Sequence, residues 1–266
     1  MPEGDTLART ADVLGKVLEG RTVAAARGRP GGAQLERVVG QRVERVEARG
    51  KHLLIGFSGG LTLHSHLGLH GSWHRYRPAE RWRRAPSRAV AVLDVGPAVA
   101  VCFDAPTVEL IETRAVALHP GLAELGPDVA RDDFEPGAAM ASLRAGDAGR
   151  TLGDALLDQR SLAGLGNVYR SELPFIERLS PFTPLAAVPD DVLLHMLERA
   201  ARLVAASTAS GRRITTGSAR APLYVYGRTG RACRRCGTAI ASTTTRGERR
   251  RRVYWCPRCQ PMASHM

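Results

Sequence analysis

The sequence predicts an α+β multidomain fold: an N-terminal helix with an antiparallel β-sandwich, a helical domain, and a C-terminal β-hairpin carrying cysteines. Three observations predict it. Short alternating segments separated by glycine-rich turns fill residues 20–118, apolar residues at helical spacing dominate after residue 134, and two Cys-x-x-Cys pairs lie near the end. A chain of 266 residues is long enough for two or three such domains.

The first domain is expected over residues 1–118. Residues 3–19 carry apolar side chains at helical spacing, at Leu7, Ala11, Val13, Leu14, Val17 and Leu18. The alternating segments that follow predict strands over residues 42–47, 53–57, 61–65, 90–93 and 99–103. Because these strands are short and joined by turns, they favour an antiparallel sandwich or barrel.

The rest of the chain divides by composition. A linker is expected over 119–134, a helical domain over 135–222, a cysteine-bearing finger over 223–260, and a tail over 261–266 that is set apart from the fold. Residues 151–159 predict a helix, and residues 190–206, preceded by a proline, predict the clearest one. Residues 207–222 are polar and predict a loop.

Charge is concentrated in the C-terminal part. The net charge is +12, yet residues 201–260 hold 14 arginines against one acid, Glu248. A compact segment of that charge is typical of a protein that binds a polyanion, most often nucleic acid; a solvated, self-repelling tail is the alternative. The sequence contains no stretch long and apolar enough for a membrane span and no recognisable leader, so a cytoplasmic protein without membrane contact is expected.

Four of the five cysteines form two pairs, Cys233-Arg-Arg-Cys236 and Cys256-Pro-Arg-Cys259, with 19 residues between them. Two such pairs on tight turns at that separation predict one structural Zn²⁺ held by four thiolates. The intervening segment reads as a β-hairpin, so the unit is predicted to be a zinc finger. Two disulfides in a secreted protein are the alternative. The fifth cysteine, Cys102, is expected to be an ordinary buried strand residue.

The N-terminus carries potential covalent chemistry. Removal of Met1 leaves Pro2 with a secondary α-amine, whose ordinary pKa of about 7.7–8 keeps part of it neutral and nucleophilic. Attack by such an amine on a sugar C1′ gives an iminium ion, and the neighbouring Glu3 can move protons to the opening ring. The alternative is a solvated terminus that has no catalytic role and only leads into the first helix.

A glycine-rich turn predicts a second site. In Leu162-Ala-Gly-Leu-Gly-Asn-Val-Tyr-Arg-Ser-Glu172, Gly164 and Gly166 permit close backbone approach, and Asn167 is the expected N-cap of the helix that follows. A helix N-terminus presented in this way binds phosphate. A plain helix–turn–helix corner has the same pattern.

Several motifs together resemble the formamidopyrimidine-DNA glycosylase/endonuclease VIII family. They are the start Pro2-Glu3-Gly4, the segment Arg49-Gly50-Lys51-His52-Leu53, the motif Gly164-Leu-Gly-Asn-Val-Tyr-Arg170, and Tyr226-Gly-Arg-Thr-Gly-Arg-Ala-Cys233 running into the finger. They follow the family's order and cover nearly the whole chain. The Glu-Gly-Asp-Thr start is closer to the endonuclease VIII branch, and the resemblance implies that the helical domain is a helix–two-turn–helix.

The resemblance implies roles for individual residues. Pro2 is implied to be the nucleophile and Glu3 the acid/base. Lys51 is implied to hold the phosphate backbone and to assist elimination. Arg251, in the finger, is implied to bind phosphate and to assist the second elimination. The residues implied to contact DNA are Asn167, Tyr169 and Arg170 around the turn, and Leu69 with His70 in the loop that fills the gap left by the flipped base. Lys51 is one of only two lysines in the chain.

The implied function is that of a bifunctional DNA glycosylase/AP lyase of base excision repair. It removes oxidised bases, with pyrimidines favoured, through a Schiff base at Pro2, and nicks the strand by β,δ-elimination. Its partner is damaged double-stranded DNA, or single-stranded or bubble DNA, and it acts as a monomer. The alternatives are an 8-oxoguanine/formamidopyrimidine glycosylase and a catalytically inactive zinc-finger DNA-binding protein. The chain departs from the family's pattern at Gly68, Glu124 and Pro174.

Overall fold

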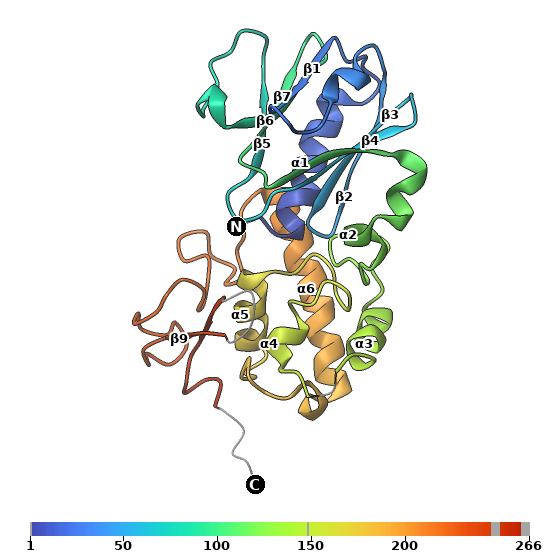
Figure 1. Ribbon diagram of the computed structural model, residues 1–266. Coiled ribbons are helices and arrows are strands. Elements are labelled where there is room, and N and C mark those ends of the chain that lie inside the picture. The colour runs from blue at the N-terminus through green and yellow to red at the C-terminus, as the bar shows by residue number, and fades with distance from the viewer. Residues whose placement is uncertain (1, 148, 246–250, 262–266) are drawn as a thin grey trace. The chain divides into compact units, whose positions relative to one another are not determined.

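The computed structural model describes residues 2–147, 149–245 and 251–261. The chain folds into two compact units, Met1–Glu124 and Leu125–Met266 (Figure 1). Within the described ranges, no helix is both long enough and apolar enough to cross a membrane.

The first unit opens with helix α1 (Gly4–Leu18), which lies where the apolar spacing predicted a helix. One stripe of α1 is buried and belongs to the same apolar core as the strands of the unit: Leu7, Ala11, Leu14 and Leu18. The opposite side of the helix is exposed, and there Lys16 pairs with Asp12 one turn earlier at 2.8 Å. The helix is therefore held by burial of one face rather than by its surface charges.

Two antiparallel four-stranded sheets form the predicted sandwich, with strand orders β1-β6-β7-β5 and β2-β3-β4-β8 (Figure 1). The strands of the first sheet are β1 (Ala25–Gly28), β5 (Ser72–Tyr76), β6 (Ala89–Asp94) and β7 (Val99–Phe103). Those of the second are β2 (Val43–Arg49), β3 (His52–Phe57), β4 (Leu61–His66) and β8 (Thr107–Glu112). The five strands expected from alternation are thus present, and β1, β5 and β8 were not foreseen.

Alternation along the strands places one side of each sheet in the core. Leu53, Ile55 and Leu63 are buried there, whereas His64, next to Leu63, lies on the other side of its sheet. Cys102 is fully buried in β7, and burial raises the pKa of its thiol above the ordinary range. This agrees with the prediction of an inert strand cysteine.

Short helices connect and cover the strands of the first unit. They are η1 (Leu35–Val38), η2 (Pro86–Arg88), η3 (Thr113–Leu118) and α2 (Pro120–Ala123). The segment expected to be a linker, 119–134, therefore begins with a helix, and its Val129 is buried in the core of the second unit. The boundary between the two compact units falls inside this segment, after Glu124.

The second unit packs helices around the long α6. They are α3 (Pro136–Arg144), α4 (Leu152–Ala155), α5 (Asn167–Ile176), η4 (Leu185–Ala187) and α6 (Asp190–Ser210). Helix α6 begins after Pro189 with two acidic residues in its first turn, and ends at Gly211 with φ 67°. Acids at the start and a left-handed glycine at the end are the ordinary boundary signals of a helix.

Two helices differ from expectation. Helix α6 extends four residues beyond position 206, into the segment predicted to be a loop. The helix expected over residues 151–159 is only α4, one turn long, because Asp158 turns its carboxylate to Arg150 at 2.7 Å and to the backbone N–H of Arg160 at 3.1 Å. Such local side-chain bonds compete with helical ones.

Pro174 lies near the end of α5, and the helix ends two residues later, at Ile176. A proline has no backbone N–H to donate to the carbonyl of the residue four positions earlier. The loss of helix stability is therefore confined to the last turn of α5. Asn167, at the other end of α5, is undisturbed.

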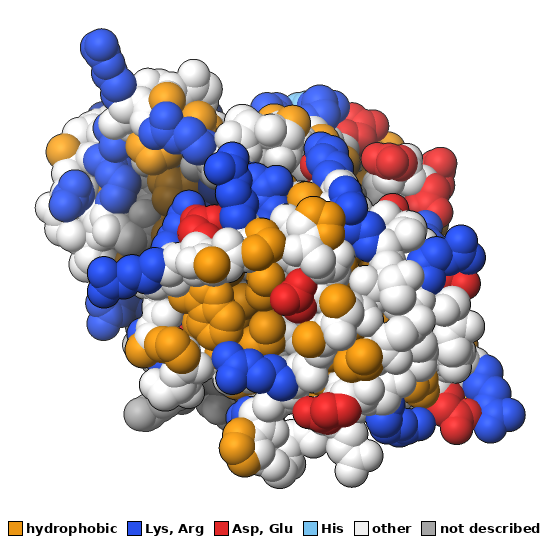
Figure 2. Space-filling model, turned by 90° about the horizontal axis from the view of Figure 1, so that it is seen from above, with side chains coloured by type: hydrophobic (Ala, Val, Ile, Leu, Met, Phe, Trp, Pro, Cys, Tyr) orange, Lys and Arg blue, Asp and Glu red, His pale blue; other side chains and the backbone are white. Residues whose placement is uncertain are grey.

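The finger follows as β9 (Ala241–Thr244) paired antiparallel with β10 (Arg252–Trp255). The hairpin prediction is therefore confirmed, although its tip, residues 246–250, lies outside the described residues, as do residues 262–266 of the expected tail. Viewed from above Figure 1, Lys and Arg side chains are spread over the surface with acids among them, and do not form one continuous patch on this face (Figure 2).

Candidate active site and metal centre

The packing of α1 on β2 places the chain's start and Lys51 at the same end of the first unit. The C-terminal end of α1 is tied to the first half of β2, since Gly20 N donates to Val43 O at 2.8 Å and Val46 N donates to the Glu19 carboxylate at 2.7 Å. Strand β2 then runs back along α1, and both elements are about 22 Å long. The turn after β2, which holds Lys51, therefore lies at the same end of the unit as Pro2.

Glu3 occupies the N-cap position of α1 and is fully buried. Its backbone carbonyl accepts the first helical bonds, from Thr6 N at 2.9 Å and Leu7 N at 3.1 Å. A carboxylate at a helix N-terminus is stabilised by the helix dipole, which offsets part of the cost of burial. Pro2, immediately before it, is half-buried.

Lys51 lies in a two-residue turn between β2 and β3, where Arg49 pairs with His52 as the last rung of the ladder. Gly50, with φ 56°, takes the left-handed conformation that the turn requires. The Lys51 side chain is half-buried. Register thus fixes where the lysine emerges, because a shift of one residue would turn it to the other face of the sheet.

The loop after β4 emerges at the same end of the sheet, since His66, the last residue of β4, pairs with His52. Leu69 and His70 are both exposed, and 59% of the Leu69 surface is accessible. Because the Leu69 side chain is apolar and exposed, it is accessible for insertion between stacked bases. Pro2, Glu3, Lys51, Leu69 and His70 are therefore brought to one end of the first unit.

Gly68 is one of the positions at which the sequence departs from the pattern of the family that it resembles, and the structure explains why a glycine is needed there. It has φ 58°, and a Cβ built on it would lie 2.9 Å from the Pro106 side chain. A side chain at this position would be both strained and in contact with Pro106, so none fits. The exposed side chains of this loop are consequently those of Leu69 and His70, which follow Gly68.

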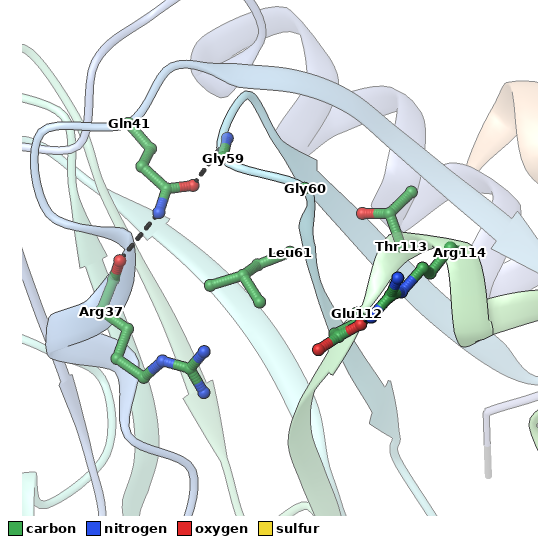
Figure 3. A pocket seen from close by; sticks show the side chains of 8 residues that line it. All are labelled: Arg37, Gln41, Gly59, Gly60, Leu61, Glu112, Thr113 and Arg114. Carbon is green, nitrogen blue, oxygen red and sulfur yellow. Dashed lines mark hydrogen bonds and ion pairs between the residues drawn. The ribbon is translucent and has the colours of Figure 1, made fainter.

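A cleft of about 680 Å³ lies at the other end of the same sheet, beyond the β3–β4 turn. Figure 3 shows Gln41 at its rim, bonded to the Arg37 carbonyl and the Gly59 backbone N–H at 2.8 and 3.0 Å. Because Lys51 belongs to the opposite end of β3, this cleft is not part of the candidate active site.

In the second unit, Asn167 is not the N-cap. Gly166 holds that position, and Asn167 is the first residue of α5. Its side chain is buried, and Nδ2 donates to the backbone carbonyl of Arg252 at 2.7 Å. The amide links the glycine-rich turn to β10, and so places the neighbouring Arg251 close to α5. The expectation of a capping side chain is corrected, because a glycine in extended conformation fills the cap position.

Tyr169 and Arg170, expected at the DNA surface, are both inside the unit. Tyr169 is fully buried and Arg170 is 2% exposed, with Nη2 at 3.3 Å from the Asp154 carboxylate. Burial lowers the pKa of the Arg170 guanidinium; Asp154 acts in the opposite direction, and the positive charge of Arg251 lowers it further. Arg170 and Arg251 are thus close enough for their positive charges to repel each other. Positive charge is therefore concentrated next to the glycine-rich turn that precedes α5.

Glu172 is a residue whose role the sequence did not reveal. It is fully buried in α5, and its carboxylate accepts the backbone N–H groups of Tyr224, Val225 and Tyr226, each at 2.8 Å, together with the hydroxyl of Thr215. One carboxylate therefore ties the segment before the finger to the helix after the turn. Its partners lie 43–54 residues away, so no local pattern signals the contact.

The four finger cysteines converge. Their sulfur atoms all lie within 4.8 Å of one another, with Cys233 to Cys259 at 3.9 Å and Cys236 to Cys256 at 3.4 Å. A disulfide needs about 2.05 Å, whereas four thiolates on one tetrahedral metal ion lie about 3.8 Å apart. The disulfide alternative is therefore wrong, since all four are free thiols, and the site can hold a metal ion.

The finger is fastened to the end of α5. The Arg235 guanidinium lies 4.4 Å from the centre of the Phe175 ring and donates to the Phe175 carbonyl at 3.0 Å. Gln260 accepts from Cys256 N at 2.9 Å and donates to the Leu179 carbonyl at 2.7 Å. A metal ion at the cysteines would thus stabilise β10 and, through it, the contact with Asn167.

Comparison with known proteins agrees with this geometry. The formamidopyrimidine-DNA glycosylase N-terminal domain matches residues 1–106, and the formamidopyrimidine-DNA glycosylase H2TH domain matches residues 125–218. A Streptomyces coelicolor protein named probable endonuclease 8 2 is 40% identical over 98% of this chain and 94% of that protein. A Mycolicibacterium smegmatis protein named DNA-(apurinic or apyrimidinic site) lyase Nei2 is 39% identical, over 98% and 99%.

The fold is shared with a solved structure. Lactococcus lactis Fpg (MutM), in a complex with DNA containing N7-benzyl-Fapy-dG, superposes with a TM-score of 0.83 at 22% identity, covering 98% of this chain and 100% of that one. The sandwich, the helix–two-turn–helix unit and the four-cysteine hairpin, with the two matching family models and the relatives at 39–40% identity, lead to one conclusion. This chain belongs to the formamidopyrimidine-DNA glycosylase family, in its endonuclease VIII-like branch.

Proposed function

We propose that this chain is a bifunctional DNA glycosylase/AP lyase that removes oxidised pyrimidines in base excision repair. The observation that supports the proposal is the buried Glu3 at the N-cap of α1, immediately after Pro2, at the end of the first unit where the β2–β3 turn also places Lys51. A protein that only bound DNA would need neither a nucleophilic terminus nor a buried carboxylate next to it. The names of the relatives support an enzymatic role.

The residues divide the chemistry between them. After Met1 is removed, the Pro2 nitrogen bonds to C1′ as the bond from C1′ to the base breaks. The base leaves with that electron pair and is protonated, which balances the proton that the Pro2 nitrogen gives up. Glu3 supplies a proton to the sugar ring oxygen as the ring opens, which leaves an iminium between C1′ and Pro2. Loss of a C2′ proton then expels the 3′ phosphate, and a second elimination expels the 5′ phosphate.

DNA contact is assigned to both units. Lys51 and Arg251 hold the backbone phosphates near the reacting sugar, and Asn167 with the turn before α5 holds a further phosphate. Leu69, with His70, enters the stack where the base has left. Tyr169 and Arg170 support this surface from inside, because both are buried. The substrate is damaged duplex DNA, bound by a monomer in the bacterial cytoplasm.

The finger holds Zn²⁺. Four thiolates at these spacings match its preferred tetrahedral set, and with four protein ligands no coordination position remains for a reacting water. The ion is therefore structural: it holds the hairpin that carries Arg251.

The test is borohydride trapping on duplex DNA containing one abasic site, 5,6-dihydrouracil or 8-oxoguanine, with zinc-loaded protein whose N-terminus has been confirmed by mass. Reduction should convert the iminium to a stable adduct on the abasic and dihydrouracil duplexes. The matched control is the same protein with Met1 retained, which should bind DNA and give no adduct. Adduct on 8-oxoguanine in preference to dihydrouracil would reassign the substrate, and DNA binding with no adduct on any duplex would overturn the proposal.

A further inference from the structure

A second group of metal-ligating side chains lies in the first unit, on the side of the β2-β3-β4-β8 sheet that faces away from the sandwich core. His64 of β4 pairs across the sheet with Glu109 of β8, and His119 follows at the start of α2. One oxygen of the Glu109 carboxylate lies 2.7 Å from His64 Nδ1 and 2.9 Å from His119 Nε2. The three side chains thus converge on one point.

We propose that His64, Glu109 and His119 bind one divalent transition-metal ion of the zinc class, separate from the ion of the finger. Two imidazoles and one carboxylate are a common protein ligand set for such ions, in which the remaining position is taken by water. The three candidate ligand atoms all lie within 4.8 Å of one another. This site is independent of the proposed enzymatic function.

The distances are close to those a metal would impose. Ligand atoms about 2.0–2.1 Å from a tetrahedral ion lie about 3.3 Å from one another. The two nitrogen–oxygen distances of 2.7 and 2.9 Å would therefore lengthen by only a few tenths of an ångström. His64 is rigidly placed within the ladder and 2% exposed, whereas the Glu109 side chain is 39% exposed and gives the ion a path from solvent.

The hydrogen-bond partner of the His64 ring on the side away from Glu109 is compatible with metal binding. In the free protein the His64 ring proton is on Nδ1, where it is donated to Glu109; a metal ion on Nδ1 would move it to Nε2, which lies 2.7 Å from Nδ1 of His52. A ring N–H held by an outer partner is the usual arrangement around a metal-bound histidine. The contact between His64 and His52 is therefore kept in the metal-bound protein with its direction reversed, because His64 Nε2 accepts from His52 in the free protein and donates to it in the metal-bound one.

The other ring must give up one contact. His119 Nδ1 accepts the backbone N–H of Gly121 at 3.2 Å, but a metal ion on Nε2 would place the ring proton on Nδ1. That hydrogen bond, which caps the one-turn helix α2, is exchanged for a metal bond, and a single neutral hydrogen bond contributes far less than a metal ligand. In return, the ion would join β4, β8 and α2.

The test is metal stoichiometry on the full chain, measured by mass spectrometry after loading with excess Zn²⁺ and gel filtration. The wild-type protein should retain two ions per chain. His119→Asn removes the Nε2 ligand but keeps an accepting oxygen at the N-cap, which asparagine fills well, so it should fold and retain one ion. Glu109→Gln should also retain one, and His74→Asn, a histidine of β5 outside the cluster, should retain two.

Cobalt identifies which ion is lost. Thiolate-bound Co²⁺ absorbs strongly in the near ultraviolet by charge transfer, and a histidine–carboxylate site does not. The His119→Asn variant should bind one Co²⁺ fewer and lose part of the visible absorption, while its thiolate charge-transfer band is unchanged. One ion per chain in the wild type, or two ions in both His119→Asn and Glu109→Gln, would overturn the proposal and leave the cluster as a hydrogen-bonded network.

Discussion

The carboxylate of Glu172 accepts the backbone N–H of Val225 at 2.8 Å in the interior of the second unit. The same carboxylate accepts two neighbouring N–H groups, so a single buried anion takes the place of a sheet or helix in satisfying the backbone of residues 224–226. Glu172 follows the glycine-rich turn, and residues 224–226 precede the finger. The contact therefore fixes the position of the turn relative to the finger, which are two parts of the proposed DNA-binding surface.

Replacing Glu172 with Gln should destabilise the second unit by about 2–3 kcal/mol, because the amide cannot accept from every donor that faces the carboxylate. Urea unfolding followed by tryptophan fluorescence, to which Trp255 contributes from the second unit, measures the change. Glu198→Gln, in the half-exposed pair with Arg202 on α6, is the matched control and should change stability by less than about 0.5 kcal/mol. Equal effects of the two substitutions would contradict the assigned role.

Gly68→Ala should destabilise the first unit more than Gly96→Ala does. Both glycines have positive φ, at 58° and 86°, but only Gly68 has a neighbour, Pro106, within contact of an added Cβ. The control therefore carries the backbone strain alone, about 1 kcal/mol, and the difference between the variants measures the contact with Pro106. Thermal unfolding of both variants checks this, and identical melting temperatures would show that the loop moves without cost.

Leu69→Ala should slow excision from duplex DNA and leave strand nicking at a preformed abasic site nearly unchanged. The reason is that a wedge assists extrusion of a stacked base, which an abasic site no longer requires. Single-turnover excision rates on the two duplexes separate these steps. Leu118→Ala, at a leucine that is 81% exposed and outside the loop, should change neither rate. An equal loss on both substrates would assign Leu69 to general binding.

Arg251→Ala should weaken DNA binding and reduce the slope of log affinity against log salt by about 0.9, because one phosphate contact is lost. Arg258→Ala, at an exposed arginine between the last two cysteines, is the control for loss of one positive charge in the finger. Fluorescence anisotropy over a salt series measures both slopes. If the two variants lose affinity and slope equally, Arg251 acts only through the general field of the finger.

Acid should weaken the second unit through Asp158. Burial alone raises the pKa of this carboxyl, but hydrogen bonds from Ser161 and the Arg160 N–H, with Arg150 alongside, lower it overall. A group with a lowered folded pKa stabilises the fold above its unfolded value, about 3.9, and this contribution disappears as pH falls below that value. The stability gap between the wild type and Asp158→Asn should therefore close as the pH falls from about 5 through the lowered pKa of Asp158, measured by urea unfolding at each pH, with Asp191→Asn, at an exposed site, as the control.

The sandwich and the long helix could be predicted because their signals are local. Alternation in residues 61–65 and the apolar stripe of residues 190–206 report which side chains of one element enter the apolar core, and this needs no knowledge of its partner. The cysteine pairs are equally local, since a tight turn brings each pair together and the chemistry of four thiolates selects the ligand.

Other features depend on partners distant in sequence. Asn167 has the composition of an N-cap, yet its amide is turned to the Arg252 carbonyl, 85 residues away. The resemblance implied a DNA contact for Arg170, but the packing of α4 against α5 buries it beside Asp154. In each case a tertiary contact overrides the local preference of the residue type.

By itself, the sequence determined the family, the nucleophile candidate at Pro2 and the four metal ligands of the finger, because each depends on residues adjacent along the chain. Only the tertiary structure decided that α1 and β2 run antiparallel and so place Pro2 and Lys51 at the same end of the first unit. It likewise decided that His64, Glu109 and His119 meet although they are spread over more than 50 residues. Strand register and helix packing set those distances, and both are selected by burial of whole faces, which no single segment of sequence encodes.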